Sequence, residues 1–148
     1  MSGRFGSRRF GDRGNHRGQA LVEFSLAITV FLLLVMAIVD FGRGIYMYNG
    51  VSQAAREVAR TTSVHPGSPL GSSTDATDTL NVQKRLVPGL EDPTYSCVAA
   101  DTYSVVTRPC IPGDLVRVEV TAPFRPITPL LGAFGPLTLK GSSTVEIQ

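Results

Sequence analysis

Residues 20–39 read ALVEFSLAITVFLLLVMAIV, an apolar run of twenty residues in which Glu23 is the one charged side chain. A helix rises about 1.5 Å per residue, so this run would extend for roughly 30 Å, the thickness of a bilayer's hydrocarbon core. It contains neither proline nor glycine, the residues that most disfavour a helix interior. We therefore predict a transmembrane helix over residues 19–40. The alternative is a helix buried in a soluble domain, which would leave only about 110 residues to cover it.

Positive charge is concentrated before the run. Residues 1–18 hold five arginines against one acid, Asp12, whereas residues 19–148 carry nine basic and eleven acidic side chains. Because lysine and arginine are enriched on the cytoplasmic side of a membrane, residues 1–18 are predicted to form a cytoplasmic leader, with the C-terminal domain extracytoplasmic. The slightly acidic body argues against a nucleic-acid-binding domain. An Arg-Gly RNA-binding tail is the alternative for the leader, and a topogenic role explains the same arginines more simply.

A secretory signal peptide shares the basic start and the apolar run. Its run is usually about 7–15 residues long and is followed by a small-x-small cleavage motif. The sequence Val39-Asp40-Phe41 at the end of this run lacks that motif. The run is therefore predicted to anchor the protein in the cytoplasmic membrane.

Glu23 needs an explanation, because a carboxylate within an apolar span is costly unless it lies near the headgroups. An acid at the interface is the simplest interpretation. The string Gly18-Gln19-Ala20-Leu21-Val22-Glu23-Phe24 favours another, since it directly follows a hydrophilic Arg/Gly-rich tail. It resembles the processing site of type IV-like prepilins, in which a membrane aspartic peptidase cuts after the glycine. The resemblance implies a processing site formed by Gly18, Gln19, Glu23 and Phe24.

Such a site has a physical logic. Glycine before the scissile bond lets an extended backbone enter a protease cleft without a side-chain clash. Cleavage would free the α-amino group of Gln19, and the Glu23 carboxylate of one subunit could pair with that amine of its neighbour. A buried pair of this kind fixes register rather than adding net stability. Gln19 and Glu23 are therefore our predicted subunit-register residues.

The resemblance continues through Val39-Asp40-Phe41-Gly42-Arg43 and through the Ala/Arg-rich stretch ending at Arg60. From Gly18 to Arg60 the chain resembles the N-terminal domain of TadE-like pseudopilins, minor pilin-like subunits of tight-adherence (Flp-type) pili. The resemblance implies a pilus assembly subunit that supports surface adhesion. Its partners would be other pilin-like subunits, the assembly machinery, a prepilin peptidase and membrane lipid. The alternatives are an unprocessed single-pass protein with an extracytoplasmic binding domain, and a type II secretion-like pseudopilin.

The helix is predicted to continue outside the membrane over residues 41–63. One narrow apolar face has helical spacing and supplies the predicted helix-packing residues, Met47, Val51, Ala54, Ala55 and Val58. The whole helix should run from about residue 20 to 62 and stop before Pro66. A second, short helix is predicted over residues 79–87, with Asp75 or Asp78 as its N-cap.

The last third of the chain indicates strands. Residues 115–121 alternate apolar and polar side chains, residues 137–140 and 143–147 supply one or two return strands, and residues 103–107 could pair with them. We therefore predict an α+β, pilin-like fold in which residues 64–148 form a globular domain. A small antiparallel sheet of three or four strands would pack against the outer half of the long helix. The apolar connection, residues 125–136, could pack on the core, lie at the membrane surface or contact another subunit.

The remaining chemistry is sparse. Cys97 and Cys110 are the only cysteines, and outside the cytoplasm they are expected to form a disulfide worth about 3 kcal/mol. A zinc site is disfavoured because His16 and His65 are the only histidines. The sequence contains no nucleophile elbow, P-loop or HExxH motif. We predict no catalytic residue, metal or cofactor, and thus no enzyme.

Overall fold

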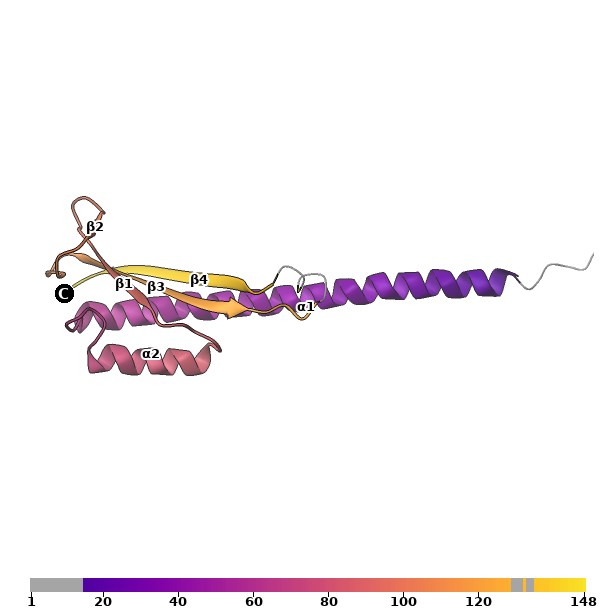
Figure 1. The fold of residues 1–148 in the computed structure, drawn as a ribbon, viewed down its shortest axis with the longest axis horizontal. Helices are drawn as coiled ribbons and strands as arrows, with labels where there is room; N and C mark the ends of the chain where they lie inside the picture. The colour runs from indigo at the N-terminus through magenta and orange to yellow at the C-terminus, as the bar shows by residue number, and fades with distance from the viewer. Residues whose placement is uncertain (1–14, 129–131, 133–134) are drawn as a thin grey trace, which may run out of the picture.

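Figure 1 shows one long helix with a small domain packed along its C-terminal half. This computed structural model describes residues 15–128, 132 and 135–148, with side chains from residue 18 onward. Most of the predicted leader, residues 1–14, therefore lies outside the described residues, as does part of the apolar connection, residues 129–131 and 133–134. The long helix, the antiparallel sheet and the way they pack confirm the predicted α+β, pilin-like fold.

Helix α1 extends from Asn15 to Val64. It begins five residues before the predicted start, because the polar residues ahead of the apolar run contain no proline and continue the same helix. The C-terminal end follows the prediction more closely. His65 donates a last helix-type hydrogen bond to the Thr61 carbonyl at 3.0 Å, and Pro66 prevents a further turn.

Helix α2 extends from Thr74 to Leu86 and lies beside α1. It starts five residues before the predicted helix, and neither predicted N-cap is correct. Ser73 caps the helix, since its hydroxyl accepts a hydrogen bond from the Ala76 N–H at 3.2 Å. Asp75 lies in the first turn instead, where its negative charge complements the helix dipole.

The sheet has four antiparallel strands in the order β2-β1-β3-β4. Their bounds are β1 Thr94–Val98, β2 Val105–Val106, β3 Leu115–Phe124 and β4 Leu137–Glu146. Strand β1 is not among the predicted strands, and β2 is shorter than the predicted segment. The two predicted return strands are one continuous strand, β4, which runs through Gly141. A Cβ atom at Gly141 would lie 2.8 Å from the carbonyl oxygen of Val51, so the missing side chain lets β4 pack directly on α1.

Strand β3 runs three residues beyond its predicted end and includes Pro123. Its neighbour β1 is paired only as far as Glu119. The carbonyl of Thr121 faces the β1 side, where it accepts a hydrogen bond from Glu91. Because alternate residues of a strand share a hydrogen-bonding direction, Pro123 also faces that side. Its missing N–H therefore removes no bond between β3 and β4.

The core lies between α1 and the inner face of β3. Every second residue of β3 from Val116 to Ala122 is fully buried. On α1, Val51, Ala54, Ala55 and Val58 are fully buried and Met47 packs against them. These are the five predicted helix-packing residues, and the alanines let the sheet approach the helix closely.

Candidate functional site

The N-terminal half of α1 projects from the domain with no described segment against it (Figure 1). Every residue from 18 to 39 is exposed, and the helix is long and apolar enough to cross a membrane once. A bare apolar surface of this extent is unfavourable in water and calls for lipid or another apolar helix around it. All four predicted processing-site residues lie on this projecting segment.

Polar groups on the segment differ in how they are satisfied. The Ser25 hydroxyl donates to the Val22 carbonyl at 2.8 Å, and the Thr29 hydroxyl donates to the Ser25 carbonyl at 2.7 Å. Both hydroxyls are therefore accommodated by the helix itself. Glu23 lies one helical turn after Gln19, and both residues line a shallow groove on the helix surface. The Glu23 side chain is exposed, and no described side chain pairs with its carboxylate.

Gly18 lies inside α1, in its first turns. A Cβ atom added there would meet nothing within 4 Å, so the fold supplies no packing reason for glycine at this position. Glycine weakens a helix by about 1 kcal/mol relative to alanine. Glycine at this position therefore makes local unwinding of the helix easier than alanine would.

A buried carboxylate marks the end of the apolar run. Asp40 is only 2% exposed and accepts hydrogen bonds from the Ile127 N–H at 2.9 and 3.0 Å and from the Thr128 N–H at 2.7 Å. The Thr128 hydroxyl also donates to it. These bonds fix the connection between β3 and β4 to α1. We call this arrangement the Asp40 latch.

Sequence reasoning missed this role of Asp40. The available signal was its position on the helix, since Met47, Val51 and Val58 follow it by 7, 11 and 18 residues on the buried face. A carboxylate on a buried face requires hydrogen-bond donors. The sequence could not indicate that the donors belong to residues 127–128.

Arg43 strengthens the same junction. Its guanidinium lies 3.2 Å from the Asp40 carboxylate and stacks over the ring of Phe124 at 5.6 Å from the centroid. Phe124 is the last residue of β3. The motif that follows the apolar run therefore connects α1 both to the end of the sheet and to the connection beyond it.

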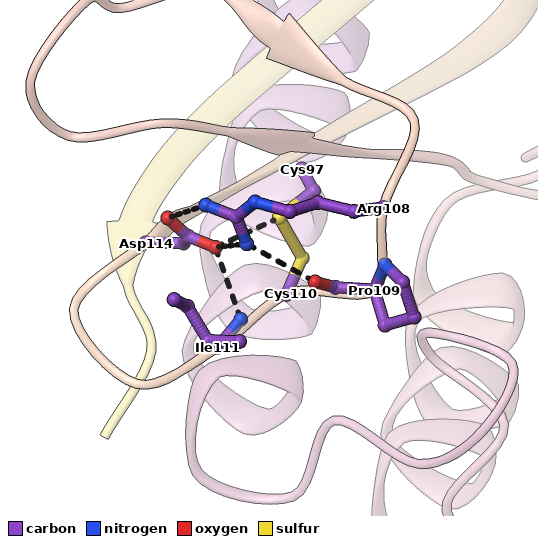
Figure 2. Close-up of a disulfide and its surroundings, with 6 residues drawn as sticks. All are labelled: Cys97, Arg108, Pro109, Cys110, Ile111 and Asp114. Carbon is purple, nitrogen blue, oxygen red and sulfur yellow. Dashed lines mark hydrogen bonds and ion pairs between the residues drawn. A yellow bond between two sulfur atoms is a disulfide. The ribbon is translucent and has the colours of Figure 1, made fainter.

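The disulfide predicted between Cys97 and Cys110 is present, with the two Cα atoms 5.6 Å apart. Cys97 pairs with Val116 near the start of β3, and an ion pair lies beside the disulfide (Figure 2). Arg108 donates two hydrogen bonds to the Asp114 carboxylate at 2.6 and 2.9 Å, and the Ile111 N–H donates a third at 3.0 Å. The Arg108 hydrogen bonds lower the pKa of Asp114, with the Ile111 bond the next largest cause. The cluster ties the loop after β2 to the start of β3.

Metal ligands do not gather in the part of the chain that the structure describes, where no group of three histidine, cysteine, aspartate or glutamate side chains could hold an ion. The two cysteines are joined to each other. Asp40 and Asp114, both buried, are satisfied by hydrogen bonds from within the fold. Both carboxylates therefore hold segments of the fold together.

Comparison with known families finds a match over the projecting segment and the part of α1 that follows it. Residues 18–60 match the family model of TadE-like proteins. The match covers the stretch from Gly18 to Arg60 in which the sequence resembles TadE-like pseudopilins. It contains the predicted processing-site residues, the Asp40 carboxylate and the buried face of α1. No curated protein and no solved structure matches the chain significantly.

Proposed function

We propose that the chain is an assembly subunit of a type IV-like, tight-adherence pilus that supports surface adhesion. A prepilin peptidase cuts it after Gly18, and the bare half of α1 then associates with neighbouring subunits. The observation that carries the proposal is this bare apolar helix with Glu23 one turn from Gln19. The family match over residues 18–60 supports it.

Before cleavage, the subunit crosses the cytoplasmic membrane once. The arginines of residues 1–18 keep the N-terminus in the cytoplasm, and the domain lies outside. After cleavage, the new α-amino group at Gln19 is a cation available to a partner. A neighbouring Glu23 carboxylate pairs with it, which offsets part of the cost of holding both charges in an apolar bundle and sets the axial register. The chain itself acts as a building block and as a peptidase substrate, not as a catalyst.

The test measures intact mass and N-terminal sequence of the protein from native membranes and from sheared surface fibres, with and without the prepilin peptidase. A chain that begins at Gln19 only when the peptidase is present is the expected result. A chain that retains residues 1–18 in every preparation would overturn the proposal in favour of an unprocessed, membrane-anchored binding domain.

A pair of glycine variants sharpens this test. A Cβ atom at Gly18 or at Gly42 meets nothing within 4 Å, so Gly18→Leu and Gly42→Leu should both fold. Gly18→Leu is expected to keep residues 1–18 in the presence of the peptidase, while Gly42→Leu is processed normally. Equal processing of both variants would show that Gly18 does not define the cleavage site.

A further inference from the structure

Large apolar side chains remain exposed beyond the end of the apolar run. We define the collar as five of them, each 47–77% exposed: Phe41, Ile45 and Tyr46 on α1, with Ile127 and Leu137 at the ends of the β3–β4 connection. Phe41 and Ile45 lie one turn apart on the helix, and Tyr46 points about 100° away from Ile45. The collar therefore presents apolar surface on several sides of α1.

The Asp40 latch sets the level of the collar along the molecule. It ties the Ile127 backbone to the residue that directly follows the apolar run, although the Ile127 side chain is 61% exposed. At the other end of the connection, Leu137 pairs with Phe124, and Phe124 lies 3.7 Å from a Cβ position at Gly44. Tyr46 is seven residues beyond Val39, a rise of about 10 Å. The collar thus falls close to the headgroup layer when the run spans a bilayer.

Charge beside the collar points to an anionic partner. Exposed Arg125 lines a groove with Tyr46 and Phe124, between α1, the end of α2 and the end of β3. Arg43 also lines it, but its guanidinium is paired with Asp40. No acidic side chain is among the described residues that line this groove. Arginine forms paired hydrogen bonds with phosphate, and tyrosine is enriched at membrane interfaces, where its ring is in apolar surroundings and its hydroxyl is hydrated.

We infer that the collar is a second membrane contact, through which the domain rests in the headgroup layer of the outer leaflet and Arg125 meets lipid phosphate. The inference rests on the proposed membrane-spanning helix and adds a lipid-facing surface on the domain itself. A neighbouring subunit is the other occupant that could cover these side chains, and the experiment separates the two.

Tryptophan fluorescence provides the test, because the chain has no tryptophan of its own. Three aromatic residues with exposed side chains sample three levels: Phe31 in the apolar run, Tyr46 in the collar and Tyr103 in the β1–β2 turn. Full-length Phe31→Trp, Tyr46→Trp and Tyr103→Trp variants are reconstituted at low protein density into phosphatidylcholine/phosphatidylglycerol vesicles. Brominated lipids quench tryptophan from the bilayer, and iodide quenches it from water.

The expected result is lipid quenching and a blue-shifted emission for Phe31→Trp and Tyr46→Trp, with iodide quenching alone for Tyr103→Trp. Lipid quenching of Phe31→Trp without that of Tyr46→Trp would overturn the collar contact and leave the spanning helix intact. Absence of lipid quenching in Phe31→Trp would overturn the spanning helix and the inference together. A Tyr46→Trp probe shielded from both quenchers would show a neighbouring subunit on the collar, which also overturns the inference.

A charge variant tests the role of phosphate. In the Tyr46→Trp background, raising the phosphatidylglycerol fraction is expected to increase lipid quenching, and Arg125→Gln should reduce that increase. Arg56→Gln is the matched control, since Arg56 is also exposed but lies about 20 Å beyond Arg43 along α1. Equal responses in the two arginine variants would contradict a phosphate contact by Arg125.

Discussion

Asp40 on α1 accepts hydrogen bonds from both the backbone N–H and the hydroxyl of Thr128, a residue 88 positions further along the chain. The contact joins the point where the apolar run ends to the connection between the last two strands. These hydrogen bonds therefore help to fix where the domain packs along α1.

Replacing Asp40 should therefore destabilise the domain. In Asp40→Asn the amide keeps one acceptor oxygen, but its NH₂ group faces the N–H donors of Ile127 and Thr128, which are left without the carboxylate. We expect a clear fall in Tm, measured by thermal unfolding in a non-ionic detergent. The control is Asp92→Asn, which removes an exposed pair with Lys84 worth at most about 1 kcal/mol. Equal Tm values for the two variants would show that the latch contributes no more than a surface pair.

Gly141 should tolerate no side chain. A methyl group there would meet the Val51 carbonyl oxygen at 2.8 Å and the Ser52 Cα at 3.1 Å. Because both atoms are backbone, α1 and β4 would have to separate, at a cost of about 1–3 kcal/mol. Chemical denaturation of Gly141→Ala should show this loss, and Ser142→Ala, on the exposed neighbouring residue, should show little. If Gly141→Ala had the same denaturation midpoint as the wild type, α1 and β4 would be less closely packed at this point than the structure shows.

The elements that the sequence predicts well have strong local patterns. The apolar run, the buried face from Met47 to Val58 and the alternation of residues 115–121 each follow from spacing alone. Strand β1 has only five residues, so its alternation is too short to be recognised in the sequence. Its pairing with β3 places Tyr95 and Cys97 opposite the inward Val118 and Val116. Asp40 was missed for a related reason, since its hydrogen-bond donors belong to a distant connection.

Acid should weaken the end of the domain that contains the disulfide. Hydrogen bonds from Arg108, and then from the Ile111 N–H, hold the pKa of Asp114 below its ordinary value of 3.8. Because the folded pKa lies below the unfolded one, the ionised carboxylate stabilises the fold at every pH above about 4. This stabilisation is lost as the pH falls through the lowered pKa.

The measurement compares Tm of the wild type and of Asp114→Asn as the pH is lowered in a non-ionic detergent. The difference in Tm between the two proteins should be largest at neutral pH. It should shrink as the pH falls below about 4 and Asp114 of the wild type becomes protonated. Asp78→Asn, an exposed carboxylate on α2, controls for general charge effects and should show little change. A difference for Asp114→Asn that stays constant down to pH 2 would rule out the ionised pair as its source.

Glu23 offers the most direct test of how subunits associate. Its side chain is exposed on the bare half of α1, with no described group of the domain against it, so Glu23→Ala should leave the fold and its Tm unchanged. Cleavage after Gly18 should continue, whereas incorporation into sheared fibres should fall strongly because the α-amino group of Gln19 loses its partner. Glu23→Gln should behave like Glu23→Ala if charge is required.

Ser25→Ala is the matched control, because Ser25 lies on the same segment but bonds only to its own helix. It should be processed and assembled like the wild type. N-terminal sequencing follows cleavage, and the amount of subunit in fibres relative to membranes follows assembly. If Glu23→Ala subunits enter fibres as readily as Ser25→Ala subunits, the pairing of Glu23 with Gln19 does not set the register, and the apolar surface of α1 alone would have to guide assembly.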